Sequence, residues 1–562
     1  MSAGPRRDRG RRRAGIAGAL AAAVALSITV AVDGASTAVP SLVLVVGQAV
    51  IRATPGELSR QGIESLGQTD KPALVAGVVI VSVLAGVALG RAARGRRWTA
   101  PVGMAAFALV GVLAARSAPA VSVQGAATAA VLAAVGGTVA LLALLRAGDV
   151  AAAADRPSDA HPDARTDAPD EPTGEPSPLI TGDDIGDGRP ATRFDTRPGG
   201  GGADPVIAVA ATRRRFLLSS AMAAGASVAL LGGGRALARR SVASEQRAGL
   251  VLPRPASRAG GAPGGLDVDG LSTLLTPNDE FYRIDEALIV PRVDLDRWRL
   301  RVTGMVDNPL ELTMDELVTL PLVERDITLA CVSNPVGGPL IGNARWLGVP
   351  LARLLERAGM QRGASQIVGR SVDGFTVGFP TEVALDGRDA MVAVGMNGEP
   401  LPFAHGFPAR LVVPGLYGYV SATKWLTEIE LTTLGEFDAY WVRRGWAKEA
   451  PIKIQSRIDV PRAGADVSAG PRAIAGVAWA QRRGIDRVEV RVDEGAWQRA
   501  RLGPALSDDA WRQWLLDWEA APGRRRIEVR ATGGDGEVQT DERDAPFPDG
   551  ATGLHSITVD VS

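Results

Sequence analysis

The sequence predicts three structural classes in one chain: an N-terminal α-helical membrane domain, a soluble α+β domain and a small C-terminal β-sandwich. Uncharged apolar stretches long enough to cross a bilayer are confined to the first 240 residues. From Leu271 onward, short alternating segments and Gly- and Pro-containing turns replace them. The 62 basic and 62 acidic residues give zero net charge, so no nucleic-acid partner is expected.

The membrane domain is predicted to cover residues 1–147. A basic run at residues 6–13 precedes the first uncharged stretch, as is typical of a cytoplasmic N-terminus. A cleaved signal peptide is the alternative for that stretch, and buried core helices are the alternative for all of them. The stretches that we predict as spans are 14–32, 72–90, 99–115 and 119–145.

The topology follows from the basic loop at residues 91–97. Counting the short apolar stretch 39–51 as a span would place this loop outside, against the charge bias of membrane proteins. We therefore predict that residues 38–70 form an external interfacial or re-entrant segment.

An acidic linker is predicted at residues 148–211, because it holds thirteen acidic and five basic residues with many Pro, Gly and Ala. His161 within it has no expected partner. Residues 212–240 then open with Arg213-Arg-Arg and are predicted as a fifth span, similar to a twin-arginine export signal. An ordinary positive flank of a last span is the alternative, and both interpretations place the remaining chain outside. Residues 241–270 are expected to form a Gly/Pro/Ser-rich tether.

The α+β domain is predicted at residues 271–447. Residues 298–304 alternate as a strand, and Thr313 is expected to cap a helix that begins with acidic residues. Residues 348–359 have helical spacing, with Pro350 in the first turn and Gly359 at the end.

The last domain, residues 448–562, is predicted to be a β-sandwich. Its alternating segments have the spacing of short antiparallel strands. They are residues 485–492, 511–518, 526–530 and 555–561. His555 lies in the last of them, where a structural role is expected.

Cys331 is the single cysteine of the chain, so it can form no internal disulfide. It stands where the predicted strand of residues 327–330 gives way to a Gly- and Pro-containing loop, a common position for a reactive group. Taken alone, this thiol could be a buried, inert side chain or a metal ligand. A second stretch, residues 403–425, contains His405-Gly-Phe-Pro-Ala-Arg410 and Lys424-Trp425.

Together, these stretches resemble the sulfite oxidase family of molybdopterin enzymes over roughly residues 275–562. The resemblance implies a sulfite-oxidase-like molybdopterin domain in which Cys331 ligates molybdenum as a thiolate and Arg283 is catalytic. His405, Arg410 and Lys424 would hold the pterin phosphate by charge-assisted hydrogen bonds. The full set of cofactor-binding residues implied is Asn278, Tyr282, Asp285, Ser333, Asn334, His405, Arg410, Tyr417 and Lys424.

The chain departs from the family pattern at three places. Ile284-Asp285 stands where sulfite oxidases have Asn-His, a second arginine is replaced within residues 332–335, and Phe375 replaces a tyrosine. Loss of an arginine and a phenol hydroxyl should weaken binding of the sulfite dianion. The reaction is therefore interpreted as two-electron oxo transfer at molybdenum, either sulfite oxidation or S- or N-oxide reduction, with the direction open. The alternative is a non-catalytic membrane-anchored adhesion or sensor protein.

The expected partners are a small-molecule oxo donor or acceptor and a separate electron-transfer protein, cytochrome or quinone-linked. No haem is expected, because the predicted spans hold no histidine and one cysteine cannot form Cys-x-x-Cys-His. Residues 493–500 are similar to the immunoglobulin-like domain of sulfite oxidases, which implies a possible homodimer. The expected location is the cell membrane, multi-pass, with the catalytic domain on the extracytoplasmic face.

Overall fold

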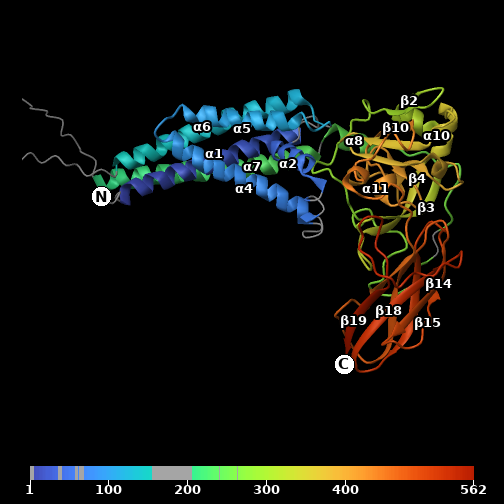
Figure 1. Ribbon diagram of the computed structural model, residues 1–562. Helices are drawn as coiled ribbons and strands as arrows, with labels where there is room; N and C mark the ends of the chain where they lie inside the picture. Colours follow the sequence, from blue (N-terminus) through green and yellow to red (C-terminus); the bar gives the residue numbers. More distant parts are fainter. Residues whose placement is uncertain are drawn as a thin grey trace, which may run out of the picture.

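A computed structural model shows a long helical bundle with two β-rich units at one end (Figure 1). The residues that it describes are 5–35, 41–56, 58, 61–62, 69–119, 121–154, 205–239, 241–261 and 264–562. Most of the predicted acidic linker, including His161, lies outside these residues.

The bundle packs around its first helix, α1, which contacts α4, α6 and α7. Small residues allow this close approach: Gly18 of α1 faces Gly86 and Gly90 of α4, with no space for a Cβ atom. The helices are α1 (Pro5–Ala35), α2 (Leu42–Ala53), α4 (Asp70–Ala93), α5 (Thr99–Ala115), α6 (Val123–Ala154) and α7 (Pro205–Arg239).

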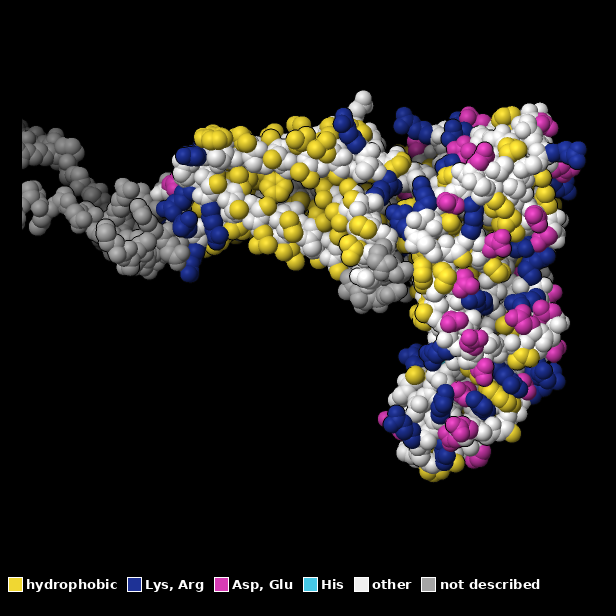
Figure 2. Space-filling view, in the orientation of Figure 1, with side chains coloured by type: hydrophobic (Ala, Val, Ile, Leu, Met, Phe, Trp, Pro, Cys, Tyr) yellow, Lys and Arg dark blue, Asp and Glu magenta, His cyan; other side chains and the backbone are white. Residues whose placement is uncertain are grey.

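Among the described residues, four helical segments are long and apolar enough to cross a membrane: Gly10–Ala35, Asp70–Ala93, Val123–Asp149 and Arg214–Gly249. The predicted span at residues 99–115 forms α5, whose 17 residues are fewer than those of the four segments. Apolar side chains cover the flanks of the bundle, and basic side chains gather toward its ends (Figure 2). Val81 and Val139, for example, are 66% and 62% exposed. This surface fits membrane anchoring.

The two ends of the bundle differ in what they contact. At the end far from the β-rich units, Arg97 pairs with Asp149 at 2.8 Å, so the basic loop lies beside the end of α6 (Figure 1). At the near end, the side-chain oxygen of Gln48 in α2 accepts a hydrogen bond from Leu288 N at 2.9 Å. The segment predicted as interfacial or re-entrant thus contains α2, a helix that reaches the soluble part of the chain.

The segment predicted as a tether lies against the α+β domain. It contains α8 (Val242–Gly249), whose Arg247 donates to the carbonyl oxygens of Leu401 and Pro400, both at 2.8 Å. Further along, Ala256 N donates to Leu322 O at 2.8 Å. These hydrogen bonds hold the segment on the surface of the domain.

Two sheets form the α+β domain. The first has the order β2-β1-β10-β5-β6, and the second has the order β3-β4-β7-β8 with β9 on β7. Only β1 and β10 pair in parallel within these sheets. The strands are β1 (Leu300–Gly304), β2 (Leu310–Leu312), β3 (Val323–Ala330), β4 (Ile341–Pro350), β5 (Gln366–Ser371), β6 (Thr376–Pro380), β7 (Met391–Met396), β8 (Glu399–Pro400), β9 (Arg410–Val412) and β10 (Leu426–Thr432).

Short helices connect the strands of these sheets. The sequence signals for the start of α9 and for the end of α10 are confirmed. Thr313 caps α9 in a capping box: its hydroxyl accepts from Glu316 N at 3.2 Å, and the Glu316 carboxylate accepts from Thr313 N at 2.8 Å. Gly359 ends α10 with a left-handed φ of 68°. The helices are α9 (Met314–Thr319), α10 (Leu351–Ala358), η2 (Thr381–Ala384), η3 (Phe403–His405), α11 (Gly418–Ser421) and η4 (Val442–Arg444).

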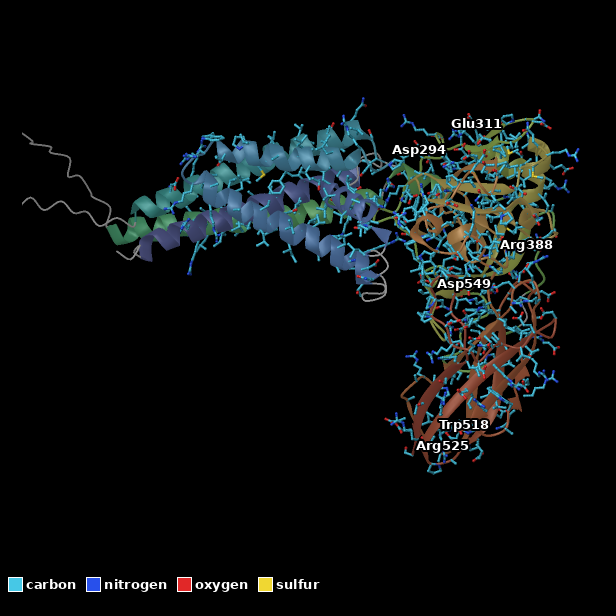
Figure 3. All side chains as sticks on the ribbon, viewed as in Figure 1. Asp294, Glu311, Arg388, Trp518, Arg525 and Asp549 are labelled. Carbon is cyan, nitrogen blue, oxygen red and sulfur yellow. The ribbon has the colours of Figure 1, made fainter. Side chains whose placement is uncertain are left out.

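The C-terminal unit has two sheets, β11-β13-β17-β16 and β12-β19-β18-β14-β15, which enclose one apolar core. The predicted strands are confirmed within β14, β17, β18 and β19. Trp518 and Arg525 lie toward its far end, and Asp549 lies near the α+β domain (Figure 3). Its strands are β11 (Gln455–Val460), β12 (Asp466–Val467), β13 (Gly470–Trp479), β14 (Ile485–Val492), β15 (Gln498–Arg499), β16 (Arg501–Leu502), β17 (Arg512–Ala520), β18 (Gly523–Gly533) and β19 (His555–Val561).

The C-terminal unit forms hydrogen bonds with strand β3. Thr328 of β3 donates its N–H to Asp509 O at 2.9 Å, and its hydroxyl accepts from Trp511 N at 2.7 Å. Gln481 donates to the Thr328 carbonyl at 3.1 Å. His555 has a structural contact, since its Nδ1 accepts from Ile458 N at 3.0 Å. The strand that leads to Cys331 is therefore fixed from two units.

Candidate functional site

Cys331 directly follows β3 and begins a tight turn. Its N–H donates to Leu340 O at 2.9 Å, and its carbonyl accepts from Asn334 N at 3.0 Å. The Asn334 side chain completes the turn by accepting from Leu340 N at 2.8 Å. Burial raises the pKa of the Cys331 thiol, while hydrogen bonds from Ser333 and the charge of Lys424 lower it. A bound metal cation would favour the thiolate in this buried position.

Two tyrosines lie near this thiol, Tyr282 partly buried and Tyr417 buried. Burial raises the pKa of Tyr282, and the pKa also responds to the charges of Cys331 and Arg410. Burial raises the pKa of Tyr417 to about 12, with a smaller effect of Cys331. The structure therefore brings Tyr282, Tyr417 and Cys331, predicted from separate stretches of sequence, into one region.

Arg410 is a buried cation on β9, only 3% exposed. Its Nη1 donates to His405 O at 3.2 Å, its Nε to Leu411 O at 3.4 Å, and its guanidinium lies 4.9 Å from the centre of the Trp346 ring. Burial lowers its pKa to about 10, so it is charged at neutral pH. No carboxylate pairs with it within the described part of the chain. Its remaining donors can bind an anion.

His405 differs from its expected role as a cation. Burial lowers its pKa to about 4, and the charges of Arg410 and Lys424 contribute to the decrease. Its ring Nε2 lies 2.8 Å from Asn278 O, whereas its buried Nδ1 has no hydrogen-bond partner. A neutral ring that donates from Nε2 leaves Nδ1 as an acceptor. This nitrogen suits an N–H donor of a ligand.

Lys424 belongs to a cluster of three cations around one carboxylate. The Asp285 carboxylate lies 3.2 Å from Lys424 Nζ, 2.7 Å from Arg283 Nε and 2.8 Å from Lys71 Nζ. Burial raises the pKa of Asp285, but the three cations outweigh it and hold this pKa well below its usual range. Burial lowers the pKa of Lys424 to about 8. The cluster carries an excess of positive charge when Lys424 is protonated.

The remaining predicted residues have structural contacts. The Asn278 side chain donates to Glu399 Oε1 at 2.6 Å and accepts from Asn397 Nδ2 at 2.9 Å. Arg283 is tied to Asp285 and donates to Ala287 O at 3.3 Å. Its side chain is 35% exposed. Asn278 and Arg283 thus shape the loop beside His405 and Lys424.

Sequence reasoning missed two members of the site. Lys71 belongs to α4 of the bundle, and no local pattern relates it to Asp285. Thr423 has a buried hydroxyl without a hydrogen-bond partner, next to Lys424 in the chain. Gly406 lies within the stretch that indicated the site. A Cβ atom placed on it would lie 3.0 Å from the Lys424 Cα atom, and its φ of 109° is one that residues with side chains rarely adopt.

The buried atoms fit a pterin cofactor with a phosphate. His405 Nδ1 and Thr423 Oγ1 are buried without partners, and Arg410 is a buried cation without a carboxylate. One thiolate, one unpaired guanidinium and a lysine form the donor set expected for a molybdenum thiolate site with a phosphate anchor. The fold and this site define a molybdopterin-binding oxidoreductase domain.

Comparisons with known proteins agree. The model of the family described as "Oxidoreductase molybdopterin binding domain" matches residues 287–441. Human mitochondrial sulfite oxidase is 30% identical over 302 residues, which cover 45% of this chain and 55% of that protein. Nitrate reductase [NADH] 2 of Nicotiana tabacum is 34% identical over 179 residues, 27% of this chain and 20% of that protein. Residues 287–441 thus match the molybdopterin-binding oxidoreductase domain, and the chain is similar to sulfite oxidases over about half of its length.

A solved structure is also similar to part of the chain. The sulfane dehydrogenase SoxCD from Paracoccus pantotrophus has a TM-score of 0.47 and 25% identity, covering 52% of this chain and 82% of that chain. This chain spans about half the length of the sulfite oxidases that it matches.

Proposed function

We propose that this protein is a membrane-anchored, extracytoplasmic molybdopterin-dependent oxidoreductase. The observation that carries the proposal is the burial of Cys331 together with the cation Arg410, which has no carboxylate partner in the described residues. A buried charge without a counter-charge is costly, so a bound anion accounts for its presence. A non-catalytic adhesion or sensor protein would not need a buried, unpaired cation at this position.

Each residue of the site has a proposed role toward the cofactor. Cys331 would ligate molybdenum, and Ser333 would hydrogen-bond the sulfur. Arg410 and Lys424 would bind the pterin phosphate, while neutral His405 would accept a hydrogen bond from the pterin. Tyr282, Tyr417 and the Asn334 turn would enclose the sulfur. When bound, the cofactor supplies two-electron oxygen-atom transfer.

The hydrogen-bond donors of the site favour a neutral substrate. Arg283 donates to Asp285 at 2.7 Å and to Ala287 O at 3.3 Å, so fewer of its N–H groups are left for a dianion such as sulfite. Phe375 packs against Tyr440, with ring centres 5.8 Å apart, and has no hydroxyl to donate. A neutral S-oxide or N-oxide needs fewer cationic donors than sulfite. We infer that the reaction is oxygen-atom transfer on such a substrate, with sulfite as the second candidate.

The surrounding chain supports an arrangement on the outer face of the membrane. The bundle and the basic runs at residues 6–13 and 91–97 are consistent with an extracytoplasmic α+β domain. The Arg213-Arg-Arg run would serve as an export signal. The C-terminal unit would be immunoglobulin-like and mediate a homodimer, and a separate cytochrome or quinone-linked protein would exchange electrons with the site.

Elemental and pterin analysis of the purified full chain tests the proposal. We expect about one molybdenum and one molybdopterin per chain, with oxygen-atom transfer measured on dimethyl sulfoxide, trimethylamine N-oxide and sulfite. Protein from cells that cannot synthesise molybdopterin should contain neither molybdenum nor molybdopterin. A purified chain without molybdenum from competent cells would contradict the proposal and favour the adhesion or sensor alternative.

Replacement of Cys331 by serine tests the metal ligand. A hydroxyl is a poor substitute for a thiolate, so Cys331→Ser should lower turnover by more than about 100-fold. Bound molybdopterin should persist, because the contacts of Arg410 and Lys424 with the phosphate are unchanged. Ser333→Ala is the matched control, and we expect a loss of less than about tenfold for one hydrogen bond. Turnover of the Cys331→Ser variant equal to that of the original protein would reject Cys331 as the ligand.

A further inference from the structure

A cavity lies where the helical bundle meets the α+β domain, and Cys331 is not among its lining residues. Its volume is about 450 Å³, within the range of small-ligand sites. Arg52, at the end of α2, comes from the bundle, and the other lining residues come from the α+β domain. The lining residues are Arg52, Glu286, Gly374, Tyr440, Arg443 and Arg444. The site is therefore complete only where the two units are in contact.

The guanidinium groups of this cavity have no carboxylate partner in the described residues. Arg52 donates to the carbonyl oxygens of Ser117, after α5, and of Asp373, in the turn between β5 and β6. Arg444 donates to Tyr440 O at 3.1 Å, and its guanidinium carbon lies 3.5 Å from the centre of the Tyr440 ring. Arg443 lies at the exposed rim. Three arginines thus line the cavity, and none of them forms an ion pair with a carboxylate among the described residues.

Glu286 does not provide a counter-charge for these arginines. Its Oε1 is buried and has no hydrogen-bond partner. Burial raises its pKa to about 8, and the charge of Asp373 also raises it, whereas the charges of Arg444, Arg52 and Lys71 lower it. At neutral pH the carboxyl group is therefore mostly protonated and can donate a hydrogen bond. A buried polar atom without a partner is unfavourable unless a ligand satisfies it.

We propose that this cavity binds a phosphate group, that of an anionic phospholipid at the bilayer surface. Two N–H groups of one guanidinium can donate to two oxygens of a phosphate, and the Glu286 carboxyl can donate to another phosphate oxygen. The ends of α2 and α5 place the cavity at the end of the apolar bundle, where lipid headgroups lie (Figure 1, Figure 2). Inorganic phosphate shares this chemistry and is the other source. The proposal does not depend on the molybdopterin assignment.

The bound lipid would also join the two units. Arg52 already bridges the loop after α5 and the turn at Asp373, and a phosphate beside it would add contacts to Arg443 and Arg444. The α+β domain would then be held on the membrane surface by a lipid as well as by the chain.

The test is native mass spectrometry of the delipidated full chain in detergent, titrated with phosphatidylglycerol, phosphatidylcholine or inorganic phosphate. We expect one phosphatidylglycerol per chain to bind at least tenfold more tightly than phosphatidylcholine, whose choline cation the arginines repel. The double variant Arg443→Gln/Arg444→Gln should lose this preference, and Arg443→Gln alone should weaken it. The control Arg353→Gln/Arg357→Gln removes the same charge from exposed positions of α10 and should bind as the original chain does.

The arms of the titration separate the two sources. Displacement of phosphatidylglycerol by millimolar inorganic phosphate, sensitive to Arg443→Gln/Arg444→Gln, would support the shared phosphate chemistry. Phosphate binding with this sensitivity but without any preference for phosphatidylglycerol would assign the site to free phosphate and overturn the lipid. Equal binding of all ligands to the original chain and to both double variants would overturn the site itself.

Discussion

At the scale of single residues, the site depends on cations that the fold has buried. Arg410 and Lys424 are 3% and 9% exposed, and both have lowered pKa values because burial disfavours the charged form. Lys424 has the carboxylate of Asp285 beside it, whereas Arg410 has only carbonyl oxygens and an aromatic ring. The two residues should therefore respond differently to pH.

Cofactor binding by the apoprotein should weaken in alkaline solution because of Lys424. Only its protonated form binds phosphate, and its pKa in the empty site is lowered to about 8. Affinity is thus fully present below pH 8 and lost above it, by about tenfold between pH 7 and pH 9. The measurement is molybdopterin retained after equilibrium dialysis, read as the fluorescent oxidised pterin.

Lys424→Arg is the matched control for this pH dependence. A guanidinium keeps its charge across the range, so the affinity of this variant should be flat from pH 7 to pH 9. An equal decrease in both proteins would assign the pH dependence to another group.

At the scale of elements, loops and helix ends from distant parts of the chain meet at Asp285. The carboxylate receives Lys71 from the first turn of α4 at 2.8 Å, and α2 holds Leu288 through Gln48 at 2.9 Å. The loop that carries Arg283 and Asp285 is therefore fixed by the bundle as well as by the α+β domain. The bundle positions this part of the candidate site.

Lys71→Gln should lower the cofactor content of the purified protein. Without Lys71, Asp285 interacts more strongly with Lys424, so the Lys424 ammonium group is less available to bind the phosphate. We expect about a threefold to tenfold loss of affinity for molybdopterin, as for a partly buried ion pair worth about 1 kcal/mol. Lys71→Arg should restore binding. Lys448→Gln breaks a surface pair with Asp438 elsewhere and should have no effect. Full cofactor content in Lys71→Gln would show that α4 does not position the site.

At the scale of the whole molecule, the bundle has two chemically different ends. The pair of Arg97 and Asp149 marks the end far from the α+β domain, and the contacts of Lys71, Gln48 and Arg52 mark the near end. The basic loop of residues 91–97 thus lies opposite the candidate site. Basic residues are retained on the cytoplasmic side, which favours an outer location for the site.

Reporter fusions test this orientation. Alkaline phosphatase fused after Arg97 or at Asp170 should be inactive, and the same reporter fused after Arg240 should be active, because it folds only outside the cytoplasm. Green fluorescent protein fused after Arg97 or at Asp170 is the control and should fluoresce, because it folds in the cytoplasm. An active phosphatase at Asp170 would contradict the odd number of spans before the α+β domain.

Features that depend on neighbouring residues could be predicted from the sequence. The uncharged stretches predict the apolar helices. Thr313 and Glu316 predict the start of α9, and Gly359 predicts the end of α10. Each of these signals acts within one turn or one continuous segment. The resemblance carried by Cys331, His405, Arg410 and Lys424 indicated the family, because these residues stand in two short stretches.

The charge states of these groups and their surroundings depend on tertiary contacts and could not be predicted from the sequence. His405 became neutral through burial beside Arg410 and Lys424, and Lys71 reached Asp285 across 214 residues of chain. The cavity of Arg52, Glu286 and Arg444 exists only between two units. The physical reason is that pKa values and ion pairs depend on the distance through space and on burial, and neither follows from spacing along the sequence.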